Sequence, residues 1–325
     1  MVTGGAGFIG SALVKQLLSK NYHVTVVDRL SRTSIQNLES FNTLENFKLV
    51  KLDLLDEIKL AEVVKDSDLI FHLAANVDVR KGNLNPEFDF QNNIVATRNV
   101  LESMRKSNTC KKIIFTSSSV VYGEPHIIPT PEDCGPLTPL SIYGASKLAC
   151  EALICGYVGT FGFESVIFRL ANVIGASSEH GVIFDFFTKL KQSNGKFLEI
   201  LGDGNQNKSY LYIDDCVKAL TAGLDHYASK LEIFNVGADD QVDVNSIAQI
   251  IIHELGVNPE IIYSSELDGR GWIGDIKNML LSTEKLKKTG WKIHYSSKDA
   301  IIHTVKSIIE NRSNKWISKV RSRSE

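Results

Sequence analysis

Two residues four positions apart, Tyr143 and Lys147, form a pair suited to proton transfer. On a helix this spacing places both side chains on one face, about one turn apart. A lysine ammonium beside a phenol stabilises the phenolate, so we expect Lys147 to lower the pKa of Tyr143 from its usual value of about 10. Tyr143 could then act as a general base near neutral pH. Taken alone, the spacing is equally compatible with an ordinary helix surface.

A run of hydroxyl side chains precedes this pair. Thr116-Ser117-Ser118-Ser119 follows an apolar segment that reads as a strand. In a doubly wound fold, ligands bind beyond the carboxyl ends of the strands, so a hydroxyl here can face a substrate and relay a proton to Tyr143. The alternative is a serine-rich turn that only caps the strand.

A glycine-rich segment, Thr3-Gly4-Gly5-Ala6-Gly7-Phe8-Ile9-Gly10, lies close to the first residue. Its Gly-x-Gly-x-x-Gly spacing is typical of dinucleotide-binding loops, whose backbone approaches a pyrophosphate more closely than a Cβ allows. The helix that follows would direct its N-terminal N–H groups and positive dipole end at the phosphates. Only Met1 and Val2 precede Thr3, so we expect a very short strand before the loop.

The choice of nucleotide depends on Asp28, which ends the next expected strand, 18 residues after Gly10. A carboxylate there accepts hydrogen bonds from the adenosine ribose hydroxyls and repels a 2′-phosphate, which favours NAD over NADP. Arg29 and Arg32 follow and would weaken this preference. Asp53, at the end of the third expected strand, is a candidate partner for the adenine amino group.

The segments that carry these residues alternate between strands and helices. Short, nearly continuous apolar runs rich in β-branched residues are typical of strands covered by helices on both faces. Such runs lie at 23–28, 47–52, 69–73, 112–116 and 165–168, with helical patterns at 8–19, 58–64, 88–106 and 143–160. We therefore predict an α/β fold of Rossmann type with a doubly wound parallel sheet.

The rhythm of the sequence changes after Gly175. Glycine-rich turns separate helical patterns at 182–192, 214–225, 244–255 and 298–311, and a short strand at 233–236 can rejoin the first sheet. We expect a dinucleotide-binding domain over 1–174, with a returning segment near 210–237, and a smaller mixed α/β substrate domain over 175–325.

The composition is ordinary for a globular protein of 325 residues, with 43% hydrophobic and 23% charged residues. A net charge of −2 gives no reason to expect a nucleic-acid partner. No apolar run approaches the ~18 residues needed to span a membrane. The five cysteines are scattered, without zinc-binding spacing, which predicts no metal site and a reducing, cytoplasmic location.

Taken together, the motifs resemble those of the extended short-chain dehydrogenase/reductase superfamily. Within it, the chain is most similar to the NAD-dependent nucleotide-sugar epimerase/dehydratase family, typified by UDP-glucose 4-epimerase. The resemblance covers nearly the whole chain and rests on the order and spacing of several segments: Thr3–Gly10, Asp28, His72–Ala75, Asn92–Asn93, Ser117–Gly123, Tyr143–Lys147 and Arg169–Asn172.

The resemblance implies a set of residues that contact NAD. The pyrophosphate would be bound by Gly4, Gly7, Phe8, Ile9 and Gly10, the adenosine ribose by Asp28, and the adenine by Asp53 and Leu54. The nicotinamide side would be lined by Ala74, Ala75, Asn93, Tyr143 and Lys147.

The resemblance also implies catalytic and substrate-binding residues. Ser118 would be the catalytic hydroxyl, Tyr143 the base and Lys147 its partner. The nucleotide sugar would be contacted by Ser118, Asn172, Lys208, Tyr210, Arg270, Asp275 and Met279. Lys208 departs from the family pattern, which usually has arginine there; lysine keeps the charge but lacks the bidentate fork. Met279 lies near a position that limits room for a C2 acetamido group, and its flexibility favours tolerance of N-acetylated sugars.

The implied activity is that of an isomerase of carbohydrate metabolism that inverts C4 of a UDP-sugar, such as UDP-glucose or UDP-galactose. Tyr143 would remove the 4-hydroxyl proton while C4 passes a hydride to NAD, and the 4-keto sugar would turn and take the hydride back on its opposite face. The family pattern also implies a homodimer formed by the helices at 88–106 and 143–160. The apolar residues of the second helix could equally pack against the sheet: Leu148, Leu153, Ile154 and Val158.

Other functions remain open from the sequence. A sugar 4,6-dehydratase would need Asp-Glu where Ser119 and Val120 stand, which argues against dehydration. A nucleotide-sugar decarboxylase needs only a substrate carboxylate and contacts that hold it. A reductase of free carbonyl compounds would normally use NADPH, against the preference set by Asp28. A non-catalytic NAD sensor on the same fold would not need the Tyr143–Lys147 pair.

Overall fold

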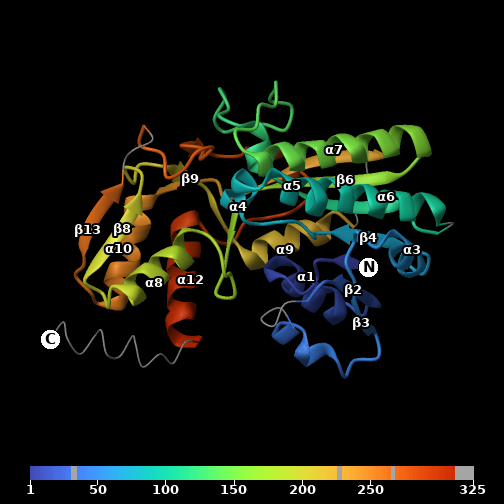
Figure 1. Ribbon diagram of the computed structural model, residues 1–325, viewed down its shortest axis with the longest axis horizontal. Coiled ribbons are helices and arrows are strands. Elements are labelled where there is room, and N and C mark those ends of the chain that lie inside the picture. Colours follow the sequence, from blue (N-terminus) through green and yellow to red (C-terminus); the bar gives the residue numbers. More distant parts are fainter. Residues whose placement is uncertain (31–34, 108, 225–228, 265–267, 312–325) are drawn as a thin grey trace.

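The computed structural model describes residues 1–30, 35–107, 109–224, 229–264 and 268–311. It has two lobes (Figure 1). The larger, which we call the sheet lobe, is built around a seven-stranded sheet, and the smaller, the small lobe, contains α8, α10, α12, β8 and β13. Arg32, which was expected to modulate nucleotide choice, lies outside the described residues.

The sheet of the large lobe has the strand order β11-β6-β5-β4-β1-β2-β3, and every neighbouring pair is parallel. This confirms the predicted doubly wound α/β fold. The strands are β1 (Val2–Thr3), β2 (Val24–Asp28), β3 (Phe47–Lys51), β4 (Leu69–His72), β5 (Lys112–Ser118), β6 (Glu164–Leu170) and β11 (Leu231–Val236).

Helices cover both faces of this sheet. One face carries α1 (Phe8–Ser19) and α9 (Ile213–Ala222), and the other carries α3 (Glu57–Val64), α6 (Ala96–Lys106) and α7 (Ile142–Phe161) (Figure 1). Strand β5 illustrates the apolar pattern, because Ile114 packs toward α1 while its neighbours Ile113 and Phe115 pack toward α6 and α7. Both faces are buried, so a continuous apolar strand is needed instead of an alternating one.

The first strand is short, as expected, yet it lies in the middle of the sheet. Val2 pairs with Val26 on one side and with Phe71 on the other. The amino group of Met1 donates to the carbonyl of Leu69 at 2.8 Å. Two residues are therefore enough to hold the glycine-rich turn between β2 and β4.

The helix predicted over 88–106 is interrupted. It consists of α5 (Pro86–Asp89), a π-helical turn η2 (Phe90–Val95) and then α6. Wide turns of this kind are frequent at functional sites because they displace side chains from the regular helical positions. Here the wide turn carries Asn92 and Asn93.

The small lobe has its own apolar core. Its main elements are α8 (Val182–Gln192), β8 (Phe197–Leu201), α10 (Val244–Leu255), β13 (Glu260–Ser264) and α12 (Ser297–Asn311), and their buried residues form one cluster. Strand β13 runs parallel to β8. Minor elements are η1 (Glu39–Phe41), α4 (Val79–Leu84), η3 (Ser119–Tyr122) and α11 (Glu284–Lys287).

Several very short strands connect the two lobes. Strand β7 (Asn172–Ile174) pairs with β10 (Tyr210–Tyr212), and β9 (Asn207–Lys208) lies between β12 (Val242–Asp243) and β14 (Asn278–Met279). These pairings bring together residues that are 34 to 71 positions apart in the sequence.

We predict that Gly10→Ala destabilises the sheet lobe. An added Cβ would overlap the carbonyl oxygen of Gly4 and lie 2.7 Å from Cα of Gly5. Overpacking of this kind costs about 1–3 kcal/mol, and we expect Tm to fall by roughly 2–10 °C. The matched control is Gly159→Ala in α7, where a Cβ meets nothing within 4 Å. Alanine should stabilise that helix by up to about 1 kcal/mol. Equal Tm values for the two variants would contradict this account.

Candidate active site

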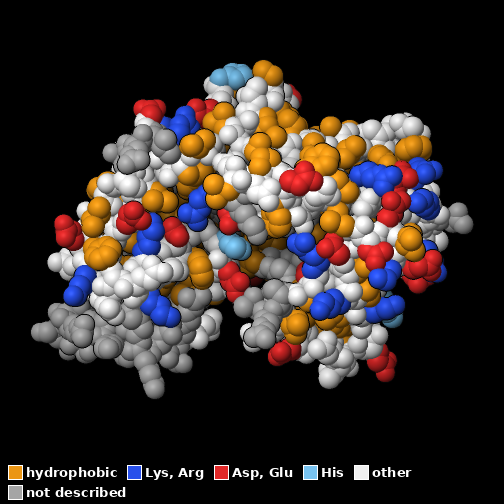
Figure 2. All heavy atoms as spheres, viewed as in Figure 1, with side chains coloured by type: hydrophobic (Ala, Val, Ile, Leu, Met, Phe, Trp, Pro, Cys, Tyr) orange, Lys and Arg blue, Asp and Glu red, His pale blue; other side chains and the backbone are white. Residues whose placement is uncertain are grey.

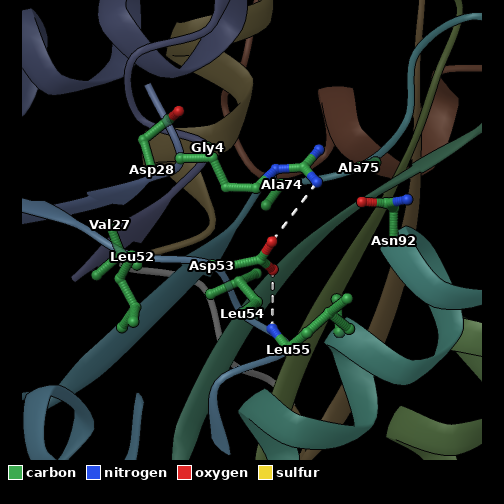
Figure 3. Close-up of a pocket in the computed structure, with 12 residues that line it drawn as sticks. Gly4, Val27, Asp28, Leu52, Asp53, Leu54, Leu55, Ala74, Ala75 and Asn92 are labelled. Carbon is green, nitrogen blue, oxygen red and sulfur yellow. Dashed lines mark hydrogen bonds and ion pairs between the residues drawn. The ribbon is translucent and has the colours of Figure 1, made fainter. Parts of the chain in front are cut away.

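A pocket opens beside the glycine-rich loop in the sheet lobe (Figure 3). It is lined by the ends of β2 and β4, by the turn after β3 and by η2. Its lining residues are Gly4, Val27, Asp28, Arg29, Leu52, Asp53, Leu54, Leu55, Ala74, Ala75, Asn92 and Ala96. Six of the residues predicted to contact NAD therefore line one pocket: Gly4, Asp28, Asp53, Leu54, Ala74 and Ala75.

The glycine-rich loop lies very close to the chain that follows β4. Gly4 has a φ of +67°, and an added Cβ would be 2.7 Å from the backbone nitrogen of Ala74. Only glycine fits there. The loop then enters α1 at Phe8, with Gly7 as its N-cap in an extended conformation. The first helical residues, Phe8, Ile9 and Gly10, thus place the N-terminus of α1 beside the loop, where backbone N–H groups can bind an anion.

Two carboxylates face this pocket from neighbouring strand ends. One oxygen of Asp28 accepts from the Ala6 N–H at 3.1 Å, and the other accepts from the Leu30 N–H at 2.9 Å. These bonds fix the Asp28 side chain against the glycine-rich loop. Asp53 accepts from the Leu55 N–H at 3.0 Å and lies 3.7 Å from the Arg29 guanidinium (Figure 3).

The three predicted catalytic side chains come together at the carboxyl end of β5. Ser118 is the last residue of β5, two residues beyond the predicted end of that strand, and Tyr143 and Lys147 lie on α7. The helix begins here because Ser141 caps it, its side chain accepting from the Gly144 N–H at 3.1 Å. The Lys147 ammonium lies 6.0 Å from the centre of the Tyr143 ring.

Lys147 is enclosed between α7 and β5. Its ammonium donates to the carbonyl of Thr116 at 2.8 Å and lies 4.7 Å from the centre of the Phe115 ring. Burial disfavours the charged form and lowers the pKa of Lys147 to about 8. A lysine in this state is charged at neutral pH and loses its charge under mildly alkaline conditions.

The pKa of Tyr143 differs from the sequence-based prediction. Burial of the phenol and the nearby carboxylate of Asp89 raise this pKa above its ordinary value, while a hydrogen bond with Ser118 acts in the opposite direction. The prediction was that Lys147 would lower it. The sign was wrong because desolvation of the phenolate dominates and the ammonium is directed at Thr116 rather than at the phenol.

The position of Asn93 differs from the prediction that it lines the nicotinamide side of the site. Asn92 lines the pocket, whereas Asn93 is fully enclosed. The Asn93 side chain accepts from the Asn76 N–H at 2.8 Å and donates to the hydroxyl of Ser146 on α7 at 2.7 Å. Asn93 therefore links η2, which lines the pocket, to α7.

A line of buried, neutral hydrogen-bonding groups ties the glycine-rich loop to α7. The hydroxyl of Thr3 lies 2.7 Å from Nδ1 of His72, and Nε2 of His72 lies 3.0 Å from the hydroxyl of Thr97. Thr97 donates to Cys150 at 3.2 Å, and Cys150 donates to the carbonyl of Asn93. Burial and the charge of Lys147 lower the pKa of His72 to about 3, so the imidazole stays neutral.

The space-filling view shows a hollow between the two lobes (Figure 2). Apart from Ser118, the predicted substrate residues come from the short strands β7, β9, β10 and β14 and from the segment between β13 and β14. Lys208 forms an ion pair with Asp275 at 2.6 Å, and Arg270 forms one with Glu124 at 2.6 Å. The side chain of Asn172 donates to the carbonyl of Ser209, next to Lys208, at 3.2 Å. Two predicted contacts are enclosed: Tyr210 lies in the small-lobe core and Met279 in an apolar cluster.

A family model described as "NAD dependent epimerase/dehydratase family" matches residues 1–237. The chain belongs to this family. The predicted resemblance is therefore confirmed, and the cofactor is NAD. The glycine loop that leaves no room for a Cβ at Gly4, the N-terminus of α1 and the carboxylate of Asp28 suit its pyrophosphate and its adenosine ribose.

Individual relatives match along nearly the whole chain. A solved UDP-galactose 4-epimerase is 39% identical, with a TM-score of 0.83 and coverage of 95% of this chain and 98% of that one. A UDP-N-acetylglucosamine 4-epimerase from Methanobrevibacter ruminantium is 32% identical, with a TM-score of 0.83 and coverage of 95% and 97%. The UDP-glucose 4-epimerase of Mycolicibacterium smegmatis is 31% identical over 94% of this chain and 96% of its own.

Other polar residues of this family member were not singled out from the sequence. Asp89 lies near Tyr143 and Lys147 and accepts from the Asn76 amide at 2.7 Å. The Lys208 ammonium lies over the Trp272 ring, 5.3 Å from the ring centre. Neither lies in a recognisable motif, and their relation to the site appears only in the folded chain.

The sequence predicts no metal site. In the described part of the chain, no group of three or more His, Cys, Asp or Glu side chains is arranged to bind a metal ion. No helix among the described residues is long and apolar enough to cross a membrane. All five cysteines carry free thiols.

We predict that Lys147→Met changes stability in a pH-dependent way. The folded pKa of about 8 lies below the ordinary value of 10.5. Folding therefore carries a cost that is fully present below the folded pKa and disappears as pH rises toward the unfolded value. The Tm of the variant minus that of the parent should thus be largest near about pH 7 and shrink by about pH 9.5.

Differential scanning calorimetry at several pH values checks this prediction. Lys191→Met, which replaces an exposed lysine at the end of α8, is the matched control. A difference in Tm for Lys147→Met that does not change with pH would show that the buried charge is not its cause.

Proposed function

We propose that this protein is a UDP-sugar 4-epimerase, an isomerase that interconverts UDP-glucose and UDP-galactose. The observation that carries the proposal is the meeting of Ser118, Tyr143 and Lys147 at the end of β5, in a chain of an NAD-dependent epimerase/dehydratase family. Relatives matched over nearly the full length have UDP-sugar 4-epimerase names, which supports the same conclusion.

In the proposed reaction, Tyr143 removes the proton from the 4-hydroxyl of the sugar. When bound beside the glycine-rich loop and Asp28, NAD would supply the redox chemistry, which is the reversible acceptance of a hydride from C4. Ser118 relays the proton and orients the 4-oxygen, and its hydrogen bond acts to lower the pKa of Tyr143. The Lys147 ammonium, 6.0 Å from the centre of the Tyr143 ring, would hold the nicotinamide ribose. The 4-keto sugar turns about its diphosphate linkage before C4 is reduced on the opposite face, and Tyr143 returns the proton. No net oxidation occurs.

The proposed nucleotide contacts come from the small lobe and the short strands that join it to the sheet lobe. Lys208 and Arg270 are the cations available to the diphosphate, and Asp275 holds both of them, through its carboxylate to Lys208 and its carbonyl to Arg270. Asn172 contributes a polar side chain at the start of β7. Met279 and Tyr210 are proposed to shape the sugar and nucleotide subsites from behind, because both are enclosed.

The same residues argue against dehydration. A 4,6-dehydratase needs a carboxylic acid to eliminate water, and positions 119 and 120 hold serine and valine. Ser119 is buried within η3. A nucleotide-sugar decarboxylase of the same family, and a non-catalytic NAD sensor, remain the alternatives that the experiments below distinguish.

The proposal also concerns the assembly and the setting of the enzyme. We propose that residues 1–174 with the returning segment form the NAD-binding domain and 175–325 the substrate domain, and that the chain works as a cytoplasmic homodimer through α6 and α7. Ile154 and Val158 already pack inside the chain, so a dimer would use the opposite, more exposed side of α7.

We predict that the purified protein interconverts UDP-glucose and UDP-galactose without added cofactor, because NAD is regenerated in each cycle. Product sugars separated by chromatography check this. UDP-N-acetylglucosamine is offered in parallel, and its conversion is expected because Met279 is flexible. Release of carbon dioxide from UDP-glucuronic acid without any C4 inversion would favour the decarboxylase. Activity only with added NADPH, with net oxidation or reduction, would contradict the proposal.

We predict that Tyr143→Phe abolishes epimerisation while NAD content stays at the parent level. Phenylalanine keeps the ring but has no proton to exchange, so kcat should fall by about 100-fold or more, the usual size of a general-base contribution. Tyr157→Phe, near the C-terminal end of the same helix, is the matched control and should retain activity. An active Tyr143→Phe enzyme would mean that the base is another residue.

A further inference from the structure

An ion pair is buried beneath the residues proposed to carry the reaction. Glu151 lies on α7, one turn beyond Lys147, and Arg169 lies on β6. Each side chain is only 4% exposed. The guanidinium meets both carboxylate oxygens, with Nη2 to Oε2 at 2.8 Å and Nε to Oε1 at 3.1 Å. This is the forked arrangement that gives arginine–carboxylate pairs their directional strength.

On one side, this pair holds the end of β5. The hydroxyl of Ser117 donates to Oε1 of Glu151, and Ser117 lies opposite Arg169 in the register of β5 and β6. The next residue along the strand is Ser118. One turn earlier on α7, Lys147 donates to the carbonyl of Thr116. Helix α7 is thus attached to the two residues that immediately precede Ser118.

On its other side, the pair holds the turn that follows Ser118. Nη1 of Arg169 donates to the hydroxyl of Tyr122 at 2.8 Å and to the carbonyl of Glu132 at 3.0 Å. Tyr122 is the last residue of η3, which Ser118 caps, and its hydroxyl donates to Asn235 of β11 at 2.8 Å. Ser118 is therefore fixed from both directions along the chain by the same guanidinium–carboxylate group.

We propose that Glu151 and Arg169 are a positioning pair for the epimerisation reaction: they clamp α7 to the ends of β5 and β6 and so fix Ser118, Tyr143 and Lys147 relative to one another. The inference rests on the proposed function. A purely stabilising role is the competing explanation, yet burying an ion pair often gains no more than well-packed apolar residues would. The bonds of this pair to Ser117 and Tyr122, by contrast, end on the strand and on the turn that flank Ser118.

The pair also contributes to the charge around Lys147. Cys150 and Glu151 from its own helix and Asp89 from α5 raise the pKa of that ammonium, while the charge of Lys147 in turn helps to keep the imidazole of His72 on β4 neutral. The carboxylate of Glu151 raises the pKa of Lys147, against the lowering by burial. Removing this carboxylate while Arg169 keeps its charge should therefore lower the pKa of Lys147 further.

The experiment compares Glu151→Gln with the parent as holoenzymes. Glutamine keeps the shape and an acceptor for Ser117 but removes the charge. We expect kcat to fall between about 10- and 100-fold, the size expected for small misplacements of reacting groups. KM should change by less than about threefold, because Lys208, Arg270 and Asp275 do not touch the pair. The alkaline limb of the kcat–pH profile should move to lower pH.

Two further variants separate charge from position. In Glu151→Gln/Arg169→Gln the buried charges are removed together, so the alkaline limb should return toward its parental place while kcat stays low. Glu232→Gln, on strand β11 of the same sheet, is the matched control because it removes the ion pair between Glu232 and Lys285 of α11. It should leave kcat and its pH profile unchanged.

A merely structural role would give a different result. If Glu151→Gln lowers Tm but keeps the parental kcat and pH profile at temperatures where it is folded, the proposal is wrong and the proposed function stands. If Glu151→Gln does not fold, Arg169→Lys, which keeps the charge and loses the fork, must show the same fall in kcat at unchanged KM. If the parent itself converts no UDP-sugar, the proposed function fails first, and the inference fails with it.

Discussion

The arrangement of this protein depends on one constraint, which is that an ammonium group must be kept inside it. Lys147 reaches the carbonyl of Thr116 at 2.8 Å only because α7 lies against the end of β5. A buried charge without such partners costs several kcal/mol. The docking of α7 therefore has to satisfy Lys147, and Tyr143, one turn earlier on the helix, takes its position from that docking. Phe115 adds a second favourable contact at 4.7 Å.

The same docking explains why the inner side of α7 is polar as well as apolar. Ser146 bonds to Asn93, Cys150 bonds to Thr97, and Glu151 bonds to Arg169. A buried polar network of this kind is favourable only when its members are satisfied. It specifies one register of the helix on the sheet, since sliding α7 by one turn would separate every one of these partners.

The fold could be predicted because covered parallel strands have a strong local signal, whereas the site could be predicted only as far as its motifs extend. Strand β5 runs two residues beyond the predicted end, and the helix expected over 88–106 is interrupted. Both differences lie where tertiary bonds form, from Ser117 to Glu151 and from Asn93 to Ser146. The pKa of Tyr143 was predicted with the wrong sign for a related reason: burial belongs to the fold, and it outweighs a charge four residues away.

The two cations proposed for the diphosphate are held in unequal ways, and the inequality bears on the lysine at position 208. The carboxylate of Asp275 is almost inaccessible beneath Lys208, whereas Glu124 beside Arg270 is 43% exposed. An incoming phosphate can displace Glu124 more easily, because an exposed ion pair contributes little. Lys208 acts as a point charge between Asp275 and the ring of Trp272 and needs no fork. Once Glu124 is displaced, Arg270 is the cation that we propose to bind a phosphate with two hydrogen bonds, so lysine at position 208 would not remove bidentate recognition from the proposed site.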